Sequence, residues 1–172
     1  MTESKIETWI KAGYHILGND GLEGVKIERI ARGLNLNKSG FYYYFGTMEG
    51  FLKEVLNYHV YKAGIVAAEI SRCKTIDPEL VFVIVKHRSF FLVESQLLVK
   101  SRMGHKIEVD AAGMIISKEL IALWRRNNNV PDDPPAASAH VNVIRHFIYA
   151  RIDAGNITFK FVQDLVAETK IA

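Results

Sequence analysis

The chain has 172 residues, of which 49% are hydrophobic and 24% are charged, and its formal net charge is +3. This composition is that of a globular protein long enough to bury a substantial core, and it excludes a disordered chain. No apolar run approaches the ~20 residues of a membrane-spanning helix, and the N-terminus lacks the apolar stretch of a secretory signal. The single cysteine, Cys73, excludes an intramolecular disulfide and a cysteine-based zinc site. We therefore expect a soluble cytoplasmic protein that does not associate with a membrane.

The first predicted element is a helix that begins after Ser4. Ser4 and Glu7 have the spacing of a capping box, in which each residue satisfies a backbone amide of the other. The cluster Gly18–Gly21 is expected to end the helix. Apolar or small residues recur between these limits with the helical period, at Ile6, Trp9, Ile10, Gly13, Ile16 and Leu17.

Residues 25–55 predict two short helices joined by a tight turn. Ile27, Ile30 and Ala31 form one apolar stripe at helical spacing. Asn35 can adopt the left-handed backbone conformation at low cost, and Asn37 can cap the next helix through its side-chain oxygen.

The second of these helices begins with Lys38 and Ser39 and then becomes aromatic. Phe41, Tyr42 and Phe45 turn apolar surface back toward the preceding helices and form a plug. Two short helices across such a turn predict a helix-turn-helix, which offers one helix to the DNA major groove.

The remaining chain has the apolar period of helices and no lasting strand-type alternation. Five helices are predicted there. The first runs from Thr47 to about Arg72, the second from Asp77 to about Arg102, and the third from its cap Asp110 to Asn127–Asn129. The last two span Ala137–Ala154 and Thr158–Ile171. The breaks are expected at Met103–His105, at the proline-rich Val130–Pro135 and at Gly155–Asn156.

These elements resemble the TetR family of bacterial transcriptional regulators over about the first third of the chain. The residues that carry the resemblance are Ile6, Ala12, Leu17 and Gly21 in the first helix and turn, then Ile30–Ala31, Leu36, Lys38, Phe41, Tyr42 and Phe45 in the family signature. The resemblance implies an all-α fold with two domains. Residues 1–46 would form a three-helix DNA-binding domain with a helix-turn-helix, and residues 47–172 a helical bundle for ligand binding and dimerisation.

Three positions depart from the family pattern. Asn35 replaces the usual glycine of the turn, which its backbone can tolerate. Gly40 lies where the recognition helix would carry Thr or a similar side chain, and Met48 replaces a Lys just after the plug. The last two departures remove candidate contacts to DNA, so they lower the expected affinity without affecting the fold.

The candidate DNA contacts lie at the start of the two helices of the helix-turn-helix and along the second. Lys38 is at a helix N-terminus, where its cation and the backbone amides can both address phosphate. The resemblance implies that the Tyr42 hydroxyl also reaches a phosphate. The full set is Lys26, Ile27, Arg29, Lys38, Ser39, Gly40, Tyr42 and Tyr43. The expected partner is a near-palindromic double-stranded operator, read by two copies of the chain.

Charge alone does not predict DNA binding. Residues 1–60 contain seven Lys or Arg and seven Asp or Glu, and only the stretch Lys26–Lys38 is locally cationic. A solvated helix face explains such a cluster equally well, so the prediction depends on the turn and the plug.

The resemblance also implies a small-molecule effector bound in the second domain. This effector would release the operator by favouring another spacing of the two DNA-binding domains of the dimer. Each candidate has ordinary core packing as its alternative. The candidates are His59, His87, Phe90, Phe91, Glu94, His105 and Trp124.

The last two helices each carry an apolar stripe and are expected to form the interface of a homodimer. An intramolecular core face is the alternative that the stripes leave open. The predicted interface residues are Val141, Ile144, Ile148, Ile152, Phe159, Val162, Leu165 and Val166.

No pattern in the sequence predicts an enzyme, a cofactor or a metal site. There is no Gly-rich phosphate loop and no His-Glu-x-x-His or Glu-x-x-His motif, and His140 and His146 are too far apart in angle on one helix to share a metal ion easily. The favoured interpretation is a homodimeric TetR-like repressor that a small-molecule effector releases from DNA. Two alternatives stay open: a regulator that responds to a protein partner, and a helical-bundle interaction protein whose helix-turn-helix no longer binds DNA.

Overall fold

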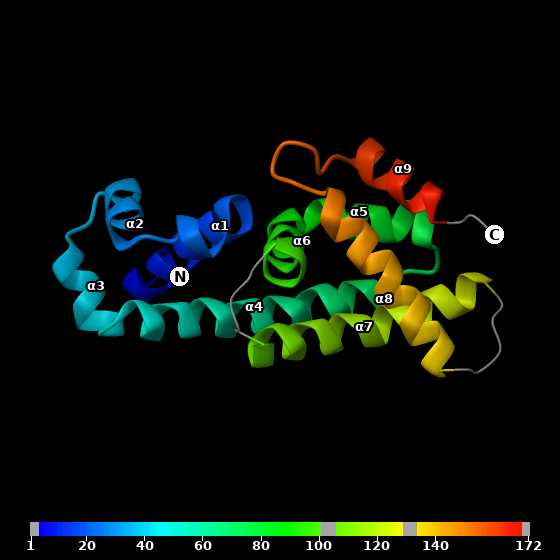
Figure 1. Cartoon of the computed structure of the whole chain (residues 1–172), viewed down its shortest axis with the longest axis horizontal. Helices are drawn as coiled ribbons and strands as arrows, with labels where there is room; N and C mark the ends of the chain where they lie inside the picture. Colours follow the sequence, from blue (N-terminus) through cyan, green and yellow to red (C-terminus); the bar gives the residue numbers. More distant parts are fainter. Residues whose placement is uncertain (1–3, 101–105, 129–133, 170–172) are drawn as a thin grey trace.

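The computed structural model describes residues 4–100, 106–128 and 134–169, and this part of the chain contains helices and turns but no strand (Figure 1). The all-α prediction is therefore confirmed. The long helix α4 runs from a head formed by α1, α2 and α3 into a bundle formed by the later helices. The helices are α1 (Lys5–Gly24), α2 (Ile27–Leu34), α3 (Lys38–Phe45), α4 (Met48–Ile70), α5 (Val81–Lys86), α6 (Arg88–Ser95), α7 (Lys106–Asn128), α8 (Pro134–Arg151) and α9 (Phe159–Glu168), with π-helical segments η1 (Ile76–Leu80) and η2 (Gln96–Lys100).

Polar side chains begin several of these helices as the sequence predicts. The Ser4 hydroxyl accepts from the backbone amide of Glu7, and the Glu7 carboxylate accepts from the backbone amide of Ser4. Asn37, Thr47 and Thr158 each accept a backbone hydrogen bond from the first turn of the helix that follows. These caps satisfy amides that have no partner within the helix, so they fix where each helix starts.

The break in α1 lies in the predicted cluster Gly18–Gly21, and Gly18 within this cluster serves a packing role. Gly18 is buried inside the helix, and a Cβ atom there would lie 3.3 Å from Leu92 Cβ of α6. The missing side chain therefore lets α1 and α6 approach closely. The helix breaks at Gly21, whose φ of 73° is left-handed, and one further turn follows to Gly24.

The expectation of one central helix over residues 77–102 is wrong. The chain breaks at His87, where φ is −101° and ψ is 32°, and this break separates α5 from α6. The consecutive side chains of Lys86 and His87 both reach Glu69 of α4, at 2.8 and 3.0 Å. A straight helix would point neighbouring side chains about 100° apart, so this shared contact favours the break.

Other helix ends are also corrected. Helix α7 already begins at Lys106, so Asp110 lies within it and does not cap it, and α8 covers Pro134–Arg151 in place of 137–154. Helix α9 ends at Glu168. The predicted break at Met103–His105 and most of the predicted loop at Val130–Pro135 lie outside the described residues.

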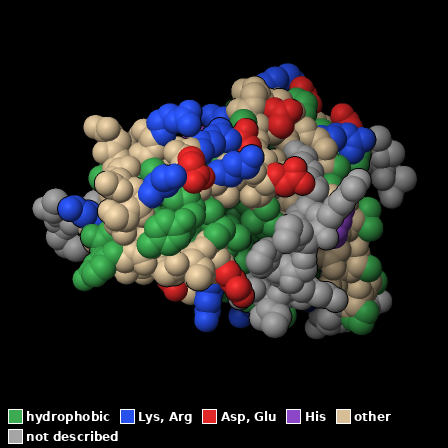
Figure 2. All heavy atoms as spheres, turned by 60° about the vertical axis from the view of Figure 1, so that its left-hand side comes forward, with side chains coloured by type: hydrophobic (Ala, Val, Ile, Leu, Met, Phe, Trp, Pro, Cys, Tyr) green, Lys and Arg blue, Asp and Glu red, His purple; other side chains and the backbone are tan. Residues whose placement is uncertain are grey.

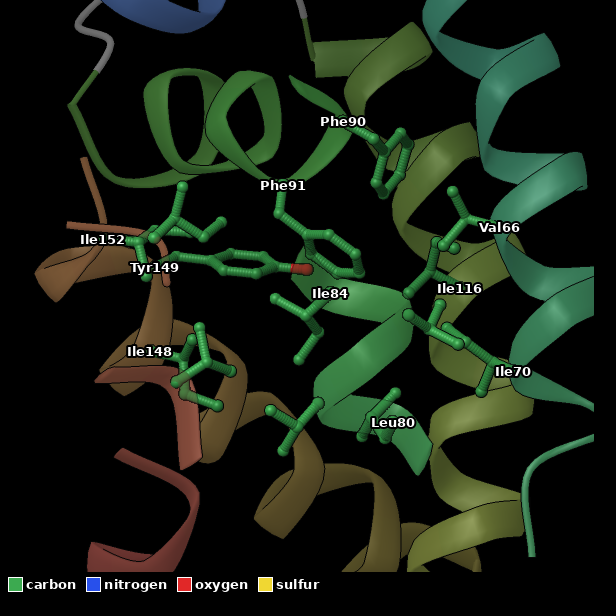
Figure 3. Packing of buried hydrophobic residues seen from close by; sticks show 14 of the residues in the cluster. Val66, Ile70, Leu80, Ile84, Phe90, Phe91, Ile116, Ile148, Tyr149 and Ile152 are labelled. Carbon is green, nitrogen blue, oxygen red and sulfur yellow. The ribbon is translucent and has the colours of Figure 1, made fainter. Parts of the chain in front are cut away.

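Two hydrophobic clusters support the head and the bundle. The first joins Trp9 of α1 and Phe41 of α3 to Phe51 of α4. The second fills the bundle, where α4 contributes residues such as Val66 and Ile70 (Figure 3). Helix α4 therefore has buried side chains in both clusters, each large one contributing about 1.5–3 kcal/mol by burial.

The contact between α1 and α4 gives a first prediction. A Cβ atom at Gly13 would lie 2.4 Å from Phe51 Cζ, so Gly13→Ala forces α1 and α4 apart. We expect this variant to lose about 1–3 kcal/mol in the free energy of unfolding, measured by urea denaturation. The matched control is Gly64→Ala within α4, where nothing lies within 4 Å of the added atom. Equal effects of the two substitutions would contradict this packing.

Candidate nucleic-acid interface

Helices α2 and α3 form a helix-turn-helix with the predicted turn geometry. Asn35 ends α2 in the left-handed conformation, with φ of 52° and ψ of 43°. Two residues later the side chain of Asn37 accepts a hydrogen bond from the backbone amide of Ser39, at 3.0 Å, and starts α3. The two asparagines therefore make a short connection that turns the chain sharply between the helices.

A buried aromatic side chain holds α3 in place. Phe41 is fully buried, and its ring centroid lies 5.4 Å from that of Trp9 and 5.1 Å from that of Phe51. Phe45 is half-buried and packs on Phe51 as well, at 4.9 Å. Because three helices meet at Phe41, its burial fixes which face of α3 turns outward.

The outward face of α3 carries the predicted DNA contacts. Tyr42 is 54% exposed and Tyr43 is 85% exposed, which is unusual for large aromatic side chains. Lys38 and Ser39 are also exposed at the start of the helix. Of the other predicted residues, Lys26 and Arg29 are exposed and Ile27 and Gly40 are half-buried. The described structure therefore brings the whole predicted set to α2, α3 and the residue before α2.

Acidic side chains partly neutralise this surface. Lys38 Nζ lies 3.1 Å from Glu28 Oε1, and the Arg29 guanidinium lies 2.7 Å from Asp20. A backbone amide and then Lys38 hold the pKa of Glu28 below its usual value, so this carboxylate is charged at neutral pH. With this end of the molecule turned forward, Figure 2 shows Lys and Arg side chains interleaved with Asp and Glu. A phosphate must therefore displace a carboxylate to reach Lys38.

This pairing leads to a second prediction. Glu28→Gln frees Lys38 and removes a negative charge near the approaching phosphate, so we expect DNA affinity to rise about two- to fivefold, as an exposed ion pair contributes little. Fluorescence anisotropy with a DNA fragment selected for binding measures the change. Glu168→Gln on α9 alters the net charge equally and is the control. A weaker complex with Glu28→Gln would mean that Glu28 orders Lys38 for binding.

A buried polar chain crosses from the head into the bundle, and we give this name to Tyr14, His59, Glu94 and Arg145. The Tyr14 hydroxyl lies 2.8 Å from His59 Nδ1, His59 Nε2 lies 2.9 Å from Glu94, and Arg145 donates to the other Glu94 oxygen at 3.0 Å. These residues come from α1, α4, α6 and α8, and all four are buried. Burial raises the pKa of Tyr14 well above its usual value, so its hydroxyl keeps its proton.

The predicted ligand-binding residues separate into distinct places. His59 and Glu94 belong to the buried polar chain, and Phe90 stacks on the His59 ring at 4.7 Å. Phe91 and Trp124 line a cavity in the bundle. His87 lies beside Glu69 at the break between α5 and α6, and His105 lies outside the described residues.

The lining residues that sequence reasoning missed include Arg145 and Tyr149. The available signal was a charged side chain within the apolar stripe of α8, one helical turn after Val141. Arginine is rarely buried without a partner, so its place in that stripe indicated a buried acidic partner elsewhere.

The predicted dimer residues face mostly into their own chain. Ile144 and Phe159 are half-buried, and the ring of Phe159 lies 4.6 Å from that of the exposed Phe82. Because the stripe packs within the chain, an interface on α8 and α9 would have to use their outward faces. The buried members are Val141, Ile148, Ile152, Val162, Leu165 and Val166.

The described helices include none long and apolar enough to cross a membrane. Within the same residues, no group of three or more His, Cys, Asp and Glu side chains could hold a metal ion.

An exposed helix-turn-helix on an all-α bundle is the arrangement found in DNA-binding proteins of the helix-turn-helix class. Residues 10–55 match the family model described as bacterial regulatory proteins, tetR family. The predicted resemblance is therefore confirmed, and the N-terminal part of the chain is similar to the bacterial regulatory proteins of the tetR family.

Two solved structures share the fold of the whole chain. One is a transcriptional regulator (TerR/AcrR family) from Aquifex aeolicus VF5, with 17% identity, a TM-score of 0.63, and coverage of 97% of this chain and 98% of the other. The second is a protein from Rhodococcus sp. assigned to the TetR-family transcriptional regulators, with 16% identity, a TM-score of 0.56, and coverage of 96% of each chain. At these identities the likeness shows the fold alone. A comparison with curated protein sequences gave no match.

Proposed function

We propose that this regulator is a homodimeric repressor that reads DNA with α3 and leaves its operator when a small molecule binds the bundle. The observation that supports this proposal best is the outward face of α3. Lys38, Tyr42 and Tyr43 are exposed there, and the buried Phe41 holds the helix in place. Exposed tyrosines beside cations suit contacts with a phosphate backbone and with base edges. We place its action in the cytoplasm.

The proposed division of labour follows the two hydrophobic clusters. Residues 1–46 would read DNA, and residues 47–172 would bind the effector and form the dimer. Helix α4 contributes to both clusters, so a change in its tilt would move the head together with it.

Selection of bound sequences from random DNA, followed by anisotropy titrations at several salt concentrations, tests the DNA-binding part. A near-palindromic selected site and affinity that falls steeply with salt would support it. Absence of any enriched site would favour the alternative of an interaction protein whose helix-turn-helix no longer binds DNA.

The dimer is proposed to form through the outward faces of α8 and α9. Val143 on α8 is 69% exposed, which suits a residue that a second copy covers. We predict that Val143→Asp yields a monomer in size-exclusion chromatography with light scattering. Loss of the second half-site should then weaken operator binding by about a hundredfold or more. A wild-type protein that is a stable monomer at working concentration would contradict the dimer, and Lys118→Asp on the exposed face of α7 is the control.

The effector is proposed to act through the buried polar chain, because Arg145 both lines the cavity and contacts Glu94. Movement of Arg145 would change the environment of Glu94, His59 and then Tyr14 on α1. A metabolite extract that releases the selected DNA from wild-type protein would support this role. Release that requires a protein fraction would favour the alternative of a protein partner.

A further inference from the structure

A cavity of about 590 Å³ lies within the bundle. Most of its wall is apolar and comes from η1, α5, α6, α7 and α8, with Leu80, Ile84, Phe91, Leu123 and Ile148 among the lining residues. Cavities of about 300–1,000 Å³ with such walls hold drug-sized ligands. The apolar wall alone would accept many molecules, so the chemistry of the ligand depends on the few polar groups.

Two polar side chains of α8 carry buried atoms without a partner. The Tyr149 hydroxyl and Arg145 Nε make no hydrogen bond of normal geometry among the described residues, and the side chains are 2% and 8% exposed. The hydroxyl lies near the charged groups of Glu94 and Arg145, which both act on its pKa. They are one helical turn apart on the same face of α8, and both line the cavity. Figure 3 shows the hydroxyl of Tyr149 pointing between Phe91 and Ile84. Buried polar atoms without partners are uncommon in folded proteins, and they mark places where a ligand can supply the missing bond.

Both unpartnered groups are donors. Burial raises the pKa of the Tyr149 hydroxyl well above its usual value, so the group keeps its proton at physiological pH. The guanidinium Nε of Arg145 can only donate. Thr75, whose buried Oγ1 also lacks a partner among the described residues and which lines the same cavity, can donate or accept. The cavity is therefore prepared for a hydrogen-bond acceptor.

The charges around the cavity disfavour an anionic acceptor. Arg145 is already paired with Glu94 at 3.0 Å, and the carboxylate of Asp77 also lines the cavity. Glu94 also contacts His59 Nε2 at 2.9 Å within the buried polar chain. A carboxylate ligand would add a buried negative charge. The described lining residues offer no second arginine or lysine to balance it, and His140 is their one further basic side chain.

We propose that this cavity binds an uncharged, largely apolar molecule with a carbonyl-type acceptor, which receives hydrogen bonds from the Tyr149 hydroxyl and Arg145 Nε. The inference deepens the proposed function, because such a molecule would be the effector. It would contact the buried polar chain directly at Arg145.

Three probes of similar shape test this chemistry by isothermal titration calorimetry with the full chain. Benzophenone has the carbonyl acceptor, diphenylmethane has the same two rings without it, and diphenylacetate carries a negative charge. We expect benzophenone to bind about tenfold more tightly than diphenylmethane, the usual effect of one hydrogen bond to a buried donor, and more tightly than diphenylacetate. Equal binding of the ketone and the hydrocarbon, tighter binding of the anion, or no binding of any probe would overturn the proposal.

Tyr149→Phe removes only the hydroxyl and should reduce the preference for the ketone, which keeps its bond from Arg145 Nε, while leaving the affinity for diphenylmethane unchanged. Tyr61→Phe changes an exposed tyrosine of α4 and is the matched control. Arg145→Lys keeps the charge beside Glu94 but removes Nε, so it provides a second test should Tyr149→Phe fail to fold. Equal loss of affinity for ketone and hydrocarbon in the variants would mean that these residues only shape the cavity, against the proposal.

The same probes separate this proposal from the proposed function. Adding benzophenone to the protein bound to its selected DNA measures release by anisotropy. Ketone-selective binding without release would leave the ligand chemistry intact and contradict the effector role. Binding in calorimetry by a protein that recognises no DNA would likewise support the cavity and contradict the repressor.

Discussion

Replacing Lys38 and Tyr42 together by alanine is expected to abolish specific operator binding while the protein stays folded. Both side chains are exposed on α3, and neither belongs to the buried core of the head. The double variant removes a cation and a hydroxyl from each recognition helix of a dimer. Affinity for the selected DNA should fall by about a hundredfold or more, toward the nonspecific level. Anisotropy measures the loss, and circular dichroism checks the helices.

The matched control is Lys118→Ala with Tyr61→Ala, which removes the same residue types from exposed positions on α7 and α4. Lys38→Ala alone should also reduce the slope of log affinity against log salt by about one for each phosphate that the lysine neutralises. An unchanged affinity in the Lys38 and Tyr42 double variant, with normal circular dichroism, would remove α3 as the DNA-reading element.

Replacing Glu94 by leucine is expected to cause the largest loss of stability. Glu94 is fully buried between His59 and Arg145, and its removal leaves the Arg145 guanidinium buried without a countercharge. Breaking a buried pair in this way costs about 3–5 kcal/mol in the free energy of unfolding. Urea denaturation followed by circular dichroism measures it.

The double variant Glu94→Leu with Arg145→Met should recover much of that stability, because neither charge then remains alone in the bundle. Asp164→Ala is the comparison at the surface: it breaks the exposed pair with Lys160 and should change stability by about 0.5 kcal/mol or less. A double variant less stable than Glu94→Leu alone would show that the destabilisation does not come from the unpaired charge.

The helix-turn-helix could be predicted from sequence because local interactions determine it. The left-handed backbone at Asn35, the cap at Asn37 and the spacing of Phe41 within its helix each involve residues close in the chain. The same holds for the capping residues Ser4 and Thr47. Their hydrogen bonds span only a few residues, so the side chains themselves indicate the geometry.

The break in the central segment could not be predicted because it depends on a distant residue. Nothing near His87 in the sequence indicates that Glu69 will lie beside it. The cavity and the buried polar chain pose the same difficulty. Tyr14 and Arg145 are linked through His59 and Glu94, and the four residues lie on helices from both halves of the chain. A helical period identifies which residues turn inward but not which helix they face.

The length of helix α4 has a mechanical consequence for the proposed dimer. Its 23 residues run without a break from the plug to the bundle, and at about 1.5 Å per residue they form a rod of about 35 Å. Pivoting a rod of this length by about 5° displaces its far tip by about 3 Å. Gly13 of α1 packs closely against Phe51 near this end of α4, so the head moves together with the helix. In the proposed dimer, opposite tilts of α4 in the two copies would add their displacements. The two α3 helices would then no longer match successive major grooves, which lie about 34 Å apart.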